Sequence, residues 1–169
     1  MDKMTRAFAL VAVLWLPIAW GADQKEACVL LAKTDAEAAL GEAVGDPRGQ
    51  IVSKGGAKTP AVSTCQFDSA AKGSLKSVSL MVRYSRQTGS RAVAETRKTL
   101  SKGTLGVKDL PGLGDHALWA FMKSGKTTSG QLNVFKGGAQ LAIGINGMAG
   151  EGPALEKARS LAQKILPRI

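Results

Sequence analysis

The only histidine of the chain, His116, directly follows Asp115, and this pair is the first candidate for acid–base chemistry. A histidine beside a carboxylate can take up and return a proton near neutral pH, as a hydrolase or transferase requires. Catalysis also needs a nucleophile or substrate proton within reach and a third group that orients the imidazole. The sequence contains no G-x-S-x-G motif, and the preceding "PGLG" is typical of a sharp turn. We therefore predict no catalytic residues: Asp115 closes the turn and His116 begins a strand.

The alternative hypothesis is a hydrolase or transferase that uses Asp115 and His116. A His116→Ala variant separates the two interpretations, because an unaffected function would exclude the enzyme.

The other segments do not match a metal or cofactor site. One histidine among scattered carboxylates lacks the paired spacing of zinc ligands. The segment "SGKTT" lacks the upstream glycine of a phosphate-binding loop, and "GINGMAGEG" lacks the strand–loop–helix spacing. The sequence therefore predicts no metal and no cofactor.

Sulfur chemistry rests on two residues, Cys28 and Cys65. A reactive redox pair usually has the C-x-x-C spacing, which these residues do not have. In an oxidising compartment, two distant cysteines are expected to form a structural disulfide. We predict a Cys28–Cys65 disulfide.

Residues 1–21 have the pattern of a secretory signal peptide. Lys3 and Arg6 precede an apolar run over residues 7–20, and Ala19-Trp20-Gly21 is a small-x-small cleavage pattern. The run is shorter than the ~20 residues of a membrane-spanning helix, so a retained anchor is the weaker alternative. We expect a bacterial periplasmic or secreted protein without an integral membrane segment after processing. Residues 22–169 are long enough for one domain with its own core.

Positive charge is concentrated in one part of the chain. The whole sequence has 23 basic and 13 acidic residues, and residues 72–108 contain nine basic residues against one acid, Glu95. Such a concentration attracts anions, although a merely solvated face is an equal alternative. The predicted anion- or partner-binding residues are Arg83, Arg86, Arg91, Arg97, Lys98 and Lys102. We predict no nucleic-acid partner, because the protein is expected to be exported and has few aromatic residues.

Periodicity predicts an α+β fold. Residues 75–84 alternate between apolar and polar, as in a half-buried strand, and residues 131–136 and 139–145 flank the turn residues Gly137 and Gly138. Further strands are expected over residues 63–67 and 117–122, and helices from Thr34, over 90–100 and over 153–166. Residues 46–60 are rich in glycine, lysine and proline and predict a loop. The predicted fold is an antiparallel sheet of about five strands with helices packed on it, in the order α-β-β-α-β-β-β-α.

Aromatic residues suggest a second surface. Trp119 and Phe121 share one face of their strand, and Phe135 points away from Val134 in the hairpin. If the strands align, Trp119, Phe121 and Phe135 form an apolar patch that either docks a ligand or packs in the core.

The succession of Cys28 before "LLAKTDAEAALGEAV", Cys65 in "STCQFD" and a later "LPGLGDHALW" resembles small exported bacterial domains of unknown function with a PsbP-like α+β sandwich. Some of their relatives are lipoproteins, but this chain lacks their lipid-attachment cysteine. The resemblance implies a binding or accessory role and implies no catalytic residues.

The function predicted from these observations is a non-enzymatic binding or accessory protein. Its basic surface would contact an anionic envelope component or an exported partner protein. An inhibitor of an exported enzyme is a further alternative, although a positive surface suits a basic enzyme such as lysozyme badly.

Overall fold

The computed structural model describes residues 24–85, 89–103, 106–125 and 127–169. The predicted signal peptide, residues 1–21, lies outside them. None of the helices in these ranges is long and apolar enough to cross a membrane. The helices are α1 (Ala27–Leu30), α2 (Lys33–Leu40), α3 (Ser90–Leu100), α4 (Glu151–Ile165) and the 3-10 turn η1 (Leu166–Arg168). The strands are β1 (Arg48–Lys54), β2 (Ala61–Asp68), β3 (Ser77–Tyr84), β4 (Val107–Asp109), β5 (His116–Ser124), β6 (Thr127–Lys136) and β7 (Ala139–Asn146).

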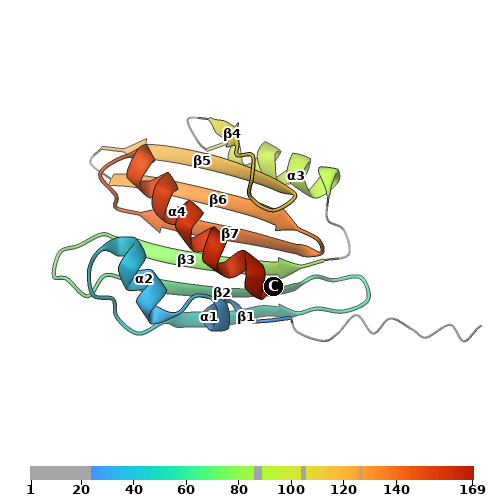
Figure 1. Cartoon of the computed structure of the whole chain (residues 1–169), viewed down its shortest axis with the longest axis horizontal. Helices are drawn as coiled ribbons and strands as arrows, with labels where there is room; N and C mark the ends of the chain where they lie inside the picture. Colours follow the sequence, from blue (N-terminus) through green and yellow to red (C-terminus); the bar gives the residue numbers. More distant parts are fainter. Residues whose placement is uncertain (1–23, 86–88, 104–105, 126) are drawn as a thin grey trace, which may run out of the picture.

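In the described part of the chain, seven strands form one antiparallel sheet in the order β1-β2-β3-β7-β6-β5-β4 (Figure 1). The strands β1 to β3 and β4 to β7 are two meanders, each with strands in sequence order. They meet in the middle of the sheet, where residues 77–84 of β3 pair with residues 139–146 of β7. This one long-range ladder makes the two halves a single sheet.

The prediction of about five strands in the order α-β-β-α-β-β-β-α is wrong. The predicted loop over residues 46–60 contains β1, because residues 48–54 form an edge strand that is exposed on both faces apart from Ser53. A strand without a buried face has no apolar alternation to detect. The predicted order also lacks β4, which has only three residues, and the single turn of α1.

One face of the sheet forms the core. Figure 1 shows α1, α2 and α4 on this face. The central strands contribute six buried residues to it: Val78, Leu80, Val82, Leu141, Ile143 and Ile145. Helix α4 packs on β6 and β7, and its residues Ala154, Ala158 and Ala162 are fully buried. Alanine allows a helix to approach a sheet closely.

The hairpin between β6 and β7 has the predicted register. Val134 pairs with Leu141 and Leu132 with Ile143. Gly137 in the turn has a φ of 53°, in the left-handed region that favours glycine. Each of these pairs joins two apolar residues on the core face. A shift of the pairing by one residue would move the apolar residues of one strand to the opposite face.

The largest buried side chain, Trp119 of β5, depends on a glycine of the neighbouring strand β6, two residues before its pairing partner Leu132. A Cβ atom on Gly130 of β6 would lie 2.1 Å from Cη2 of the indole ring. The indole Nε1 donates a hydrogen bond of 3.1 Å to Glu151 at the start of α4, and Lys108 Nζ donates to the same oxygen at 2.8 Å. The hydrogen bond from Lys108 lowers the pKa of Glu151 below its ordinary value. The tryptophan therefore joins β4, β5, β6 and α4.

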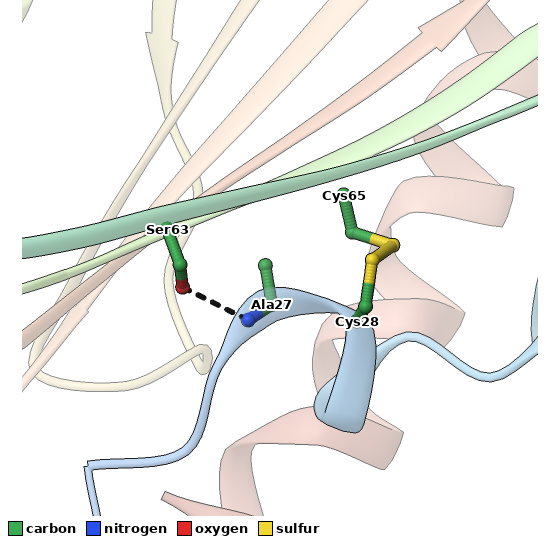
Figure 2. The surroundings of a disulfide bond; sticks show 4 residues. All are labelled: Ala27, Cys28, Ser63 and Cys65. Carbon is green, nitrogen blue, oxygen red and sulfur yellow. Dashed lines mark hydrogen bonds between the residues drawn. A yellow bond between two sulfur atoms is a disulfide. The ribbon is translucent and has the colours of Figure 1, made fainter. Parts of the chain in front are cut away.

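The predicted disulfide between Cys28 and Cys65 is present and attaches α1 to β2, with the two Cα atoms 5.0 Å apart. Figure 2 shows the bond beside the hydrogen bond that Ala27 N donates to Ser63 Oγ over 2.9 Å. A single helical turn is unstable by itself. These two links therefore hold the N-terminal end of the described chain on the sheet.

Replacing Gly130 with alanine is expected to destabilise the protein by about 1–3 kcal/mol, because the new methyl group overlaps the buried indole ring. Urea denaturation followed by tryptophan fluorescence measures this change. Gly152→Ala is the matched control, since a Cβ atom there meets nothing within 4 Å and alanine favours the helix. Equal stability of the two variants would contradict the packing described for Trp119.

Replacing both cysteines with alanine is expected to lower the free energy of unfolding by about 3–4 kcal/mol. The bond spans a sequence separation of 37 residues, and its loss gives the unfolded chain more conformational freedom. Thermal unfolding of the wild type with and without a reductant checks the same effect. Identical unfolding curves in the two conditions would show that the disulfide does not stabilise the fold.

Candidate functional site

Asp115 and His116 lie at the entry to β5, where the aspartate makes structural contacts. Its backbone N–H donates to the Phe135 carbonyl at 2.7 Å, and its Oδ2 accepts from the N–H of Gly137 at 2.8 Å. The carboxylate thus caps the β6–β7 turn instead of orienting the imidazole of His116, which is exposed. Gly114, which precedes Asp115, has a φ of 58°. A Cβ atom on Gly114 would lie 2.4 Å from the carbonyl oxygen of Phe135. This geometry favours a scaffold role for the segment.

The predicted apolar patch of Trp119, Phe121 and Phe135 does not form. In the β5–β6 register Trp119 pairs with Leu132, whereas Phe135 pairs with His116. Trp119 and Phe121, whose ring centroids are 6.5 Å apart, therefore lie on the helix-covered face, and Phe135 lies on the opposite face. Trp119 and Phe135 are both buried, so they offer no docking surface. The shared patch was wrong, because the alternation within each strand does not determine how the two strands align, whereas the alternative of packing in the interior is confirmed for Trp119 and Phe135.

Helix α3 lies on the face opposite the main core. Thr96 Oγ1 accepts a hydrogen bond of 3.3 Å from Gln140 Nε2, and Gln140 points away from the buried Leu141. Within α3, Ala92, Val93, Thr96, Arg97 and Leu100 are half-buried, and the remaining residues of the helix are exposed. The outer side of α3 is therefore free to meet a partner.

The structure brings most of the predicted basic residues to this side of the sheet. Arg83 of β3 is exposed and pairs with Gln140, next to the contact with α3. Arg91 forms an ion pair with Glu95, and Arg97 forms one with Asp109 of β4. Lys98 and Lys102 are exposed and make no ion pair with any described residue. Arg86 lies outside the described residues.

We define the basic surface as Arg83, Arg91, Lys98 and Lys102. Arg97 is excluded, because its guanidinium is neutralised by Asp109 and partly covered. Arg91 and Lys98, seven residues apart, lie on one side of α3, over a length of roughly 10 Å at 1.5 Å per residue. Lys102 lies in the turn that follows the helix.

A groove of about 540 Å³ lies on the same side of the sheet, and no sequence motif indicated it. Its polar side chains come from four strands: Gln50, Thr64, Gln66, Ser79 and Gln131. Met81, Ala142 and Gly144 lie between them. The strand pairing places Gln66, Ser79, Gly144 and Gln131 in one row across β2, β3, β7 and β6.

Two glutamines of the groove are held by acceptors on their own strands. Gln66 Nε2 donates to Asp68 Oδ1 at 2.8 Å, and Asp68 also forms an ion pair with Arg48. Gln131 Nε2 donates to Asn133 Oδ1 at 3.4 Å, and Gln140 Nε2 donates to the same oxygen at 3.3 Å. Asn133 is 1% exposed, and its Nδ2 has no hydrogen-bond partner among the described residues.

Comparisons with known proteins show only distant structural likeness. No protein-family model matches the sequence, and no curated protein matches it. Among solved structures, the chain is similar to the extracellular domain of PknH from Mycobacterium tuberculosis, with 10% sequence identity and a TM-score of 0.47. That alignment covers 83% of this chain and 95% of the other. The resemblance to PsbP-like domains stays a prediction.

Asp115→Ala is expected to reduce the free energy of unfolding by about 1 kcal/mol, because the N–H of Gly137 loses its acceptor. His116→Ala should change it by less than about 0.5 kcal/mol, since the imidazole is exposed. Chemical denaturation measures both changes, with Asp115→Asn as the control that keeps a side-chain acceptor. A larger effect from His116→Ala than from Asp115→Ala would contradict the scaffold interpretation.

Proposed function

We propose that this protein is a non-enzymatic, exported binding or accessory module. The basic surface of Arg83, Arg91, Lys98 and Lys102 would contact an anionic component of the cell envelope or an acidic partner protein. The observation that carries the proposal is the pair Lys98 and Lys102, which are exposed and have no acidic partner among the described residues.

The disulfide supports export. Cys28 and Cys65 are the only cysteines, and structural disulfides persist mainly in oxidising compartments outside the cytoplasm. The apolar run of residues 7–20, followed by a small-x-small pattern, supports the same conclusion from the sequence.

The arrangement of charges supports short-range binding to an anion. Physiological salt screens exposed charges over about 8 Å, so only groups close to the partner contribute. Arg91 lies two helical turns before Lys98 on α3, and Lys102 follows the end of the helix by two residues. The partner of Arg91, Glu95, is itself exposed, so an anionic ligand can compete for the guanidinium. The surface therefore suits a linear or clustered polyanion.

A triple charge-reversal variant should bind polyglutamate and polyphosphate roughly tenfold more weakly, or worse. It carries Arg91→Glu, Lys98→Glu and Lys102→Glu. An exposed ion pair contributes ~0.2–1 kcal/mol to binding, and the variant turns three such attractions to the polyanion into repulsions. Binding is measured by fluorescence anisotropy at low and at physiological ionic strength. The variant should also show a flatter salt dependence, because fewer ions are displaced.

The matched control carries Lys33→Glu, Lys54→Glu and Lys58→Glu. These exposed lysines lie outside the basic surface, and their reversal changes the net charge by the same amount. The control should keep most of the affinity. If both variants lose affinity equally, the effect comes from net charge alone. If the variant reversed at Arg91, Lys98 and Lys102 binds both polyanions like the wild type, the basic surface is not the binding site.

A further inference from the structure

We propose that the groove on the open face of the sheet is a binding site for a neutral oligosaccharide. This site is separate from the basic surface and does not depend on the function proposed for it. Its volume of about 540 Å³ lies within the ~300–1,000 Å³ of typical ligand sites.

The chemistry of the lining favours a ligand rich in hydroxyl groups. The side chains of Gln50, Thr64, Gln66, Ser79 and Gln131 are neutral, and amides and hydroxyls both donate and accept hydrogen bonds. Sugar hydroxyls have the same dual capacity. The one charged side chain in the lining, Arg48, is already paired with Asp68, so the groove offers little to an anion.

The two glutamines at either side of the row are oriented before any ligand arrives. Gln66 donates its amide N–H to Asp68, and Gln131 donates to Asn133. Each amide therefore leaves its Oε1 atom to accept a hydrogen bond from outside. Ordered side chains lose little conformational entropy on binding, which makes such acceptors effective.

The spacing of these acceptors suits more than one sugar unit. Gln66 and Gln131 are three strand intervals apart, and neighbouring strands are separated by ~4.8 Å, which places their backbones roughly 14 Å apart. Between them lie Ser79 and the bare backbone of Gly144, with Met81 and Ala142 in the next row. The floor at Gly144 has room for a sugar ring, and the thioether of Met81 and the methyl group of Ala142 would contact the C–H face of that ring.

A peptide is a less suitable occupant. Sheets usually bind extended peptides at a strand edge, through main-chain hydrogen bonds. Here the central strands β3 and β7 are paired with a neighbouring strand on each side, so an extended peptide cannot add to them as a further strand. Of the apolar side chains in the lining, Cys65 and Leu80 are buried in the core, so Met81 and Ala142 are the ones on the open face, which is too little to select the side chains of a peptide.

The test is binding of the whole chain to an array of neutral glycans of two to six sugars. The array also contains polyuronate chains and serine- and glutamine-rich peptides. We expect binding to at least one neutral glycan, with the signals of the Gln66 and Gln131 side-chain amides shifting in NMR titration. Failure to bind any neutral glycan at millimolar concentration, or tighter binding to the peptides or polyuronates, overturns the proposal.

Variants locate the site. Gln66→Ala and Gln131→Ala should each weaken glycan binding by roughly tenfold, since each removes one oriented acceptor. Gln163→Ala is the matched control, because Gln163 is an exposed glutamine of α4 on the other side of the sheet. Unchanged affinity in both groove variants overturns the assignment of the groove.

Gly144→Ala tests the groove floor. A Cβ atom there would lie 2.6 Å from Ser79 Oγ, a hydroxyl that can rotate away, so the variant should fold while its floor is filled. We expect loss of glycan affinity with an unchanged unfolding midpoint. Full affinity in a folded Gly144→Ala variant counts against the site. The charge-reversal variant at Arg91, Lys98 and Lys102 should keep its glycan binding. This result distinguishes the groove proposal from the proposal for the basic surface.

Discussion

The ladder between β3 and β7 is the constraint on which the rest of the structure depends. It pairs Val78 with Ile145, Leu80 with Ile143 and Val82 with Leu141, so the apolar residues of two distant segments share one face. The same register places Ser79 beside Gly144 and Met81 beside Ala142 on the other face. A slip by one residue would exchange the two faces. The core and the groove are therefore two results of one pairing.

The unequal covering of the two faces explains why both proposed surfaces lie on the same side. The helices α1, α2 and α4 cover one face (Figure 1), and α4 contributes buried alanines along its length. On the other face, α3 reaches Gln140 and is linked to β4 through Arg97 and Asp109. The remainder of that face has no helix among the described residues, and antiparallel sheets with one open face carry polar residues there. The groove lies on this open part.

Local patterns predicted those parts of the fold in which a single strand or turn carries its own signal. The alternation in residues 75–84 gave β3, and Gly137 with Gly138 gave the register of the β6–β7 hairpin. Strand β1 has no buried face, so its sequence resembles a loop. The position of Trp119 relative to Phe135 depends on the β5–β6 register, and neither strand encodes it alone. Gly130, which accommodates the indole, is likewise recognisable only once the strands are aligned.

The two proposed surfaces differ in how each would gain binding energy, and this difference explains why the sequence predicted only one of them. Net charge is additive along a chain, so nine basic residues within 72–108 are visible without any structure. Exposed lysines such as Lys98 and Lys102 attract a partner at a distance but must lose side-chain freedom on contact. The polar residues of the groove are single exposed or half-buried positions spread over four strands, and each by itself resembles an ordinary polar residue on the outer face of a strand. Polarity alone is therefore weak evidence for a ligand site. What distinguishes the groove is that Asp68 and Asn133 already hold Gln66 and Gln131 in place, because a side chain ordered before binding loses less entropy when the ligand arrives.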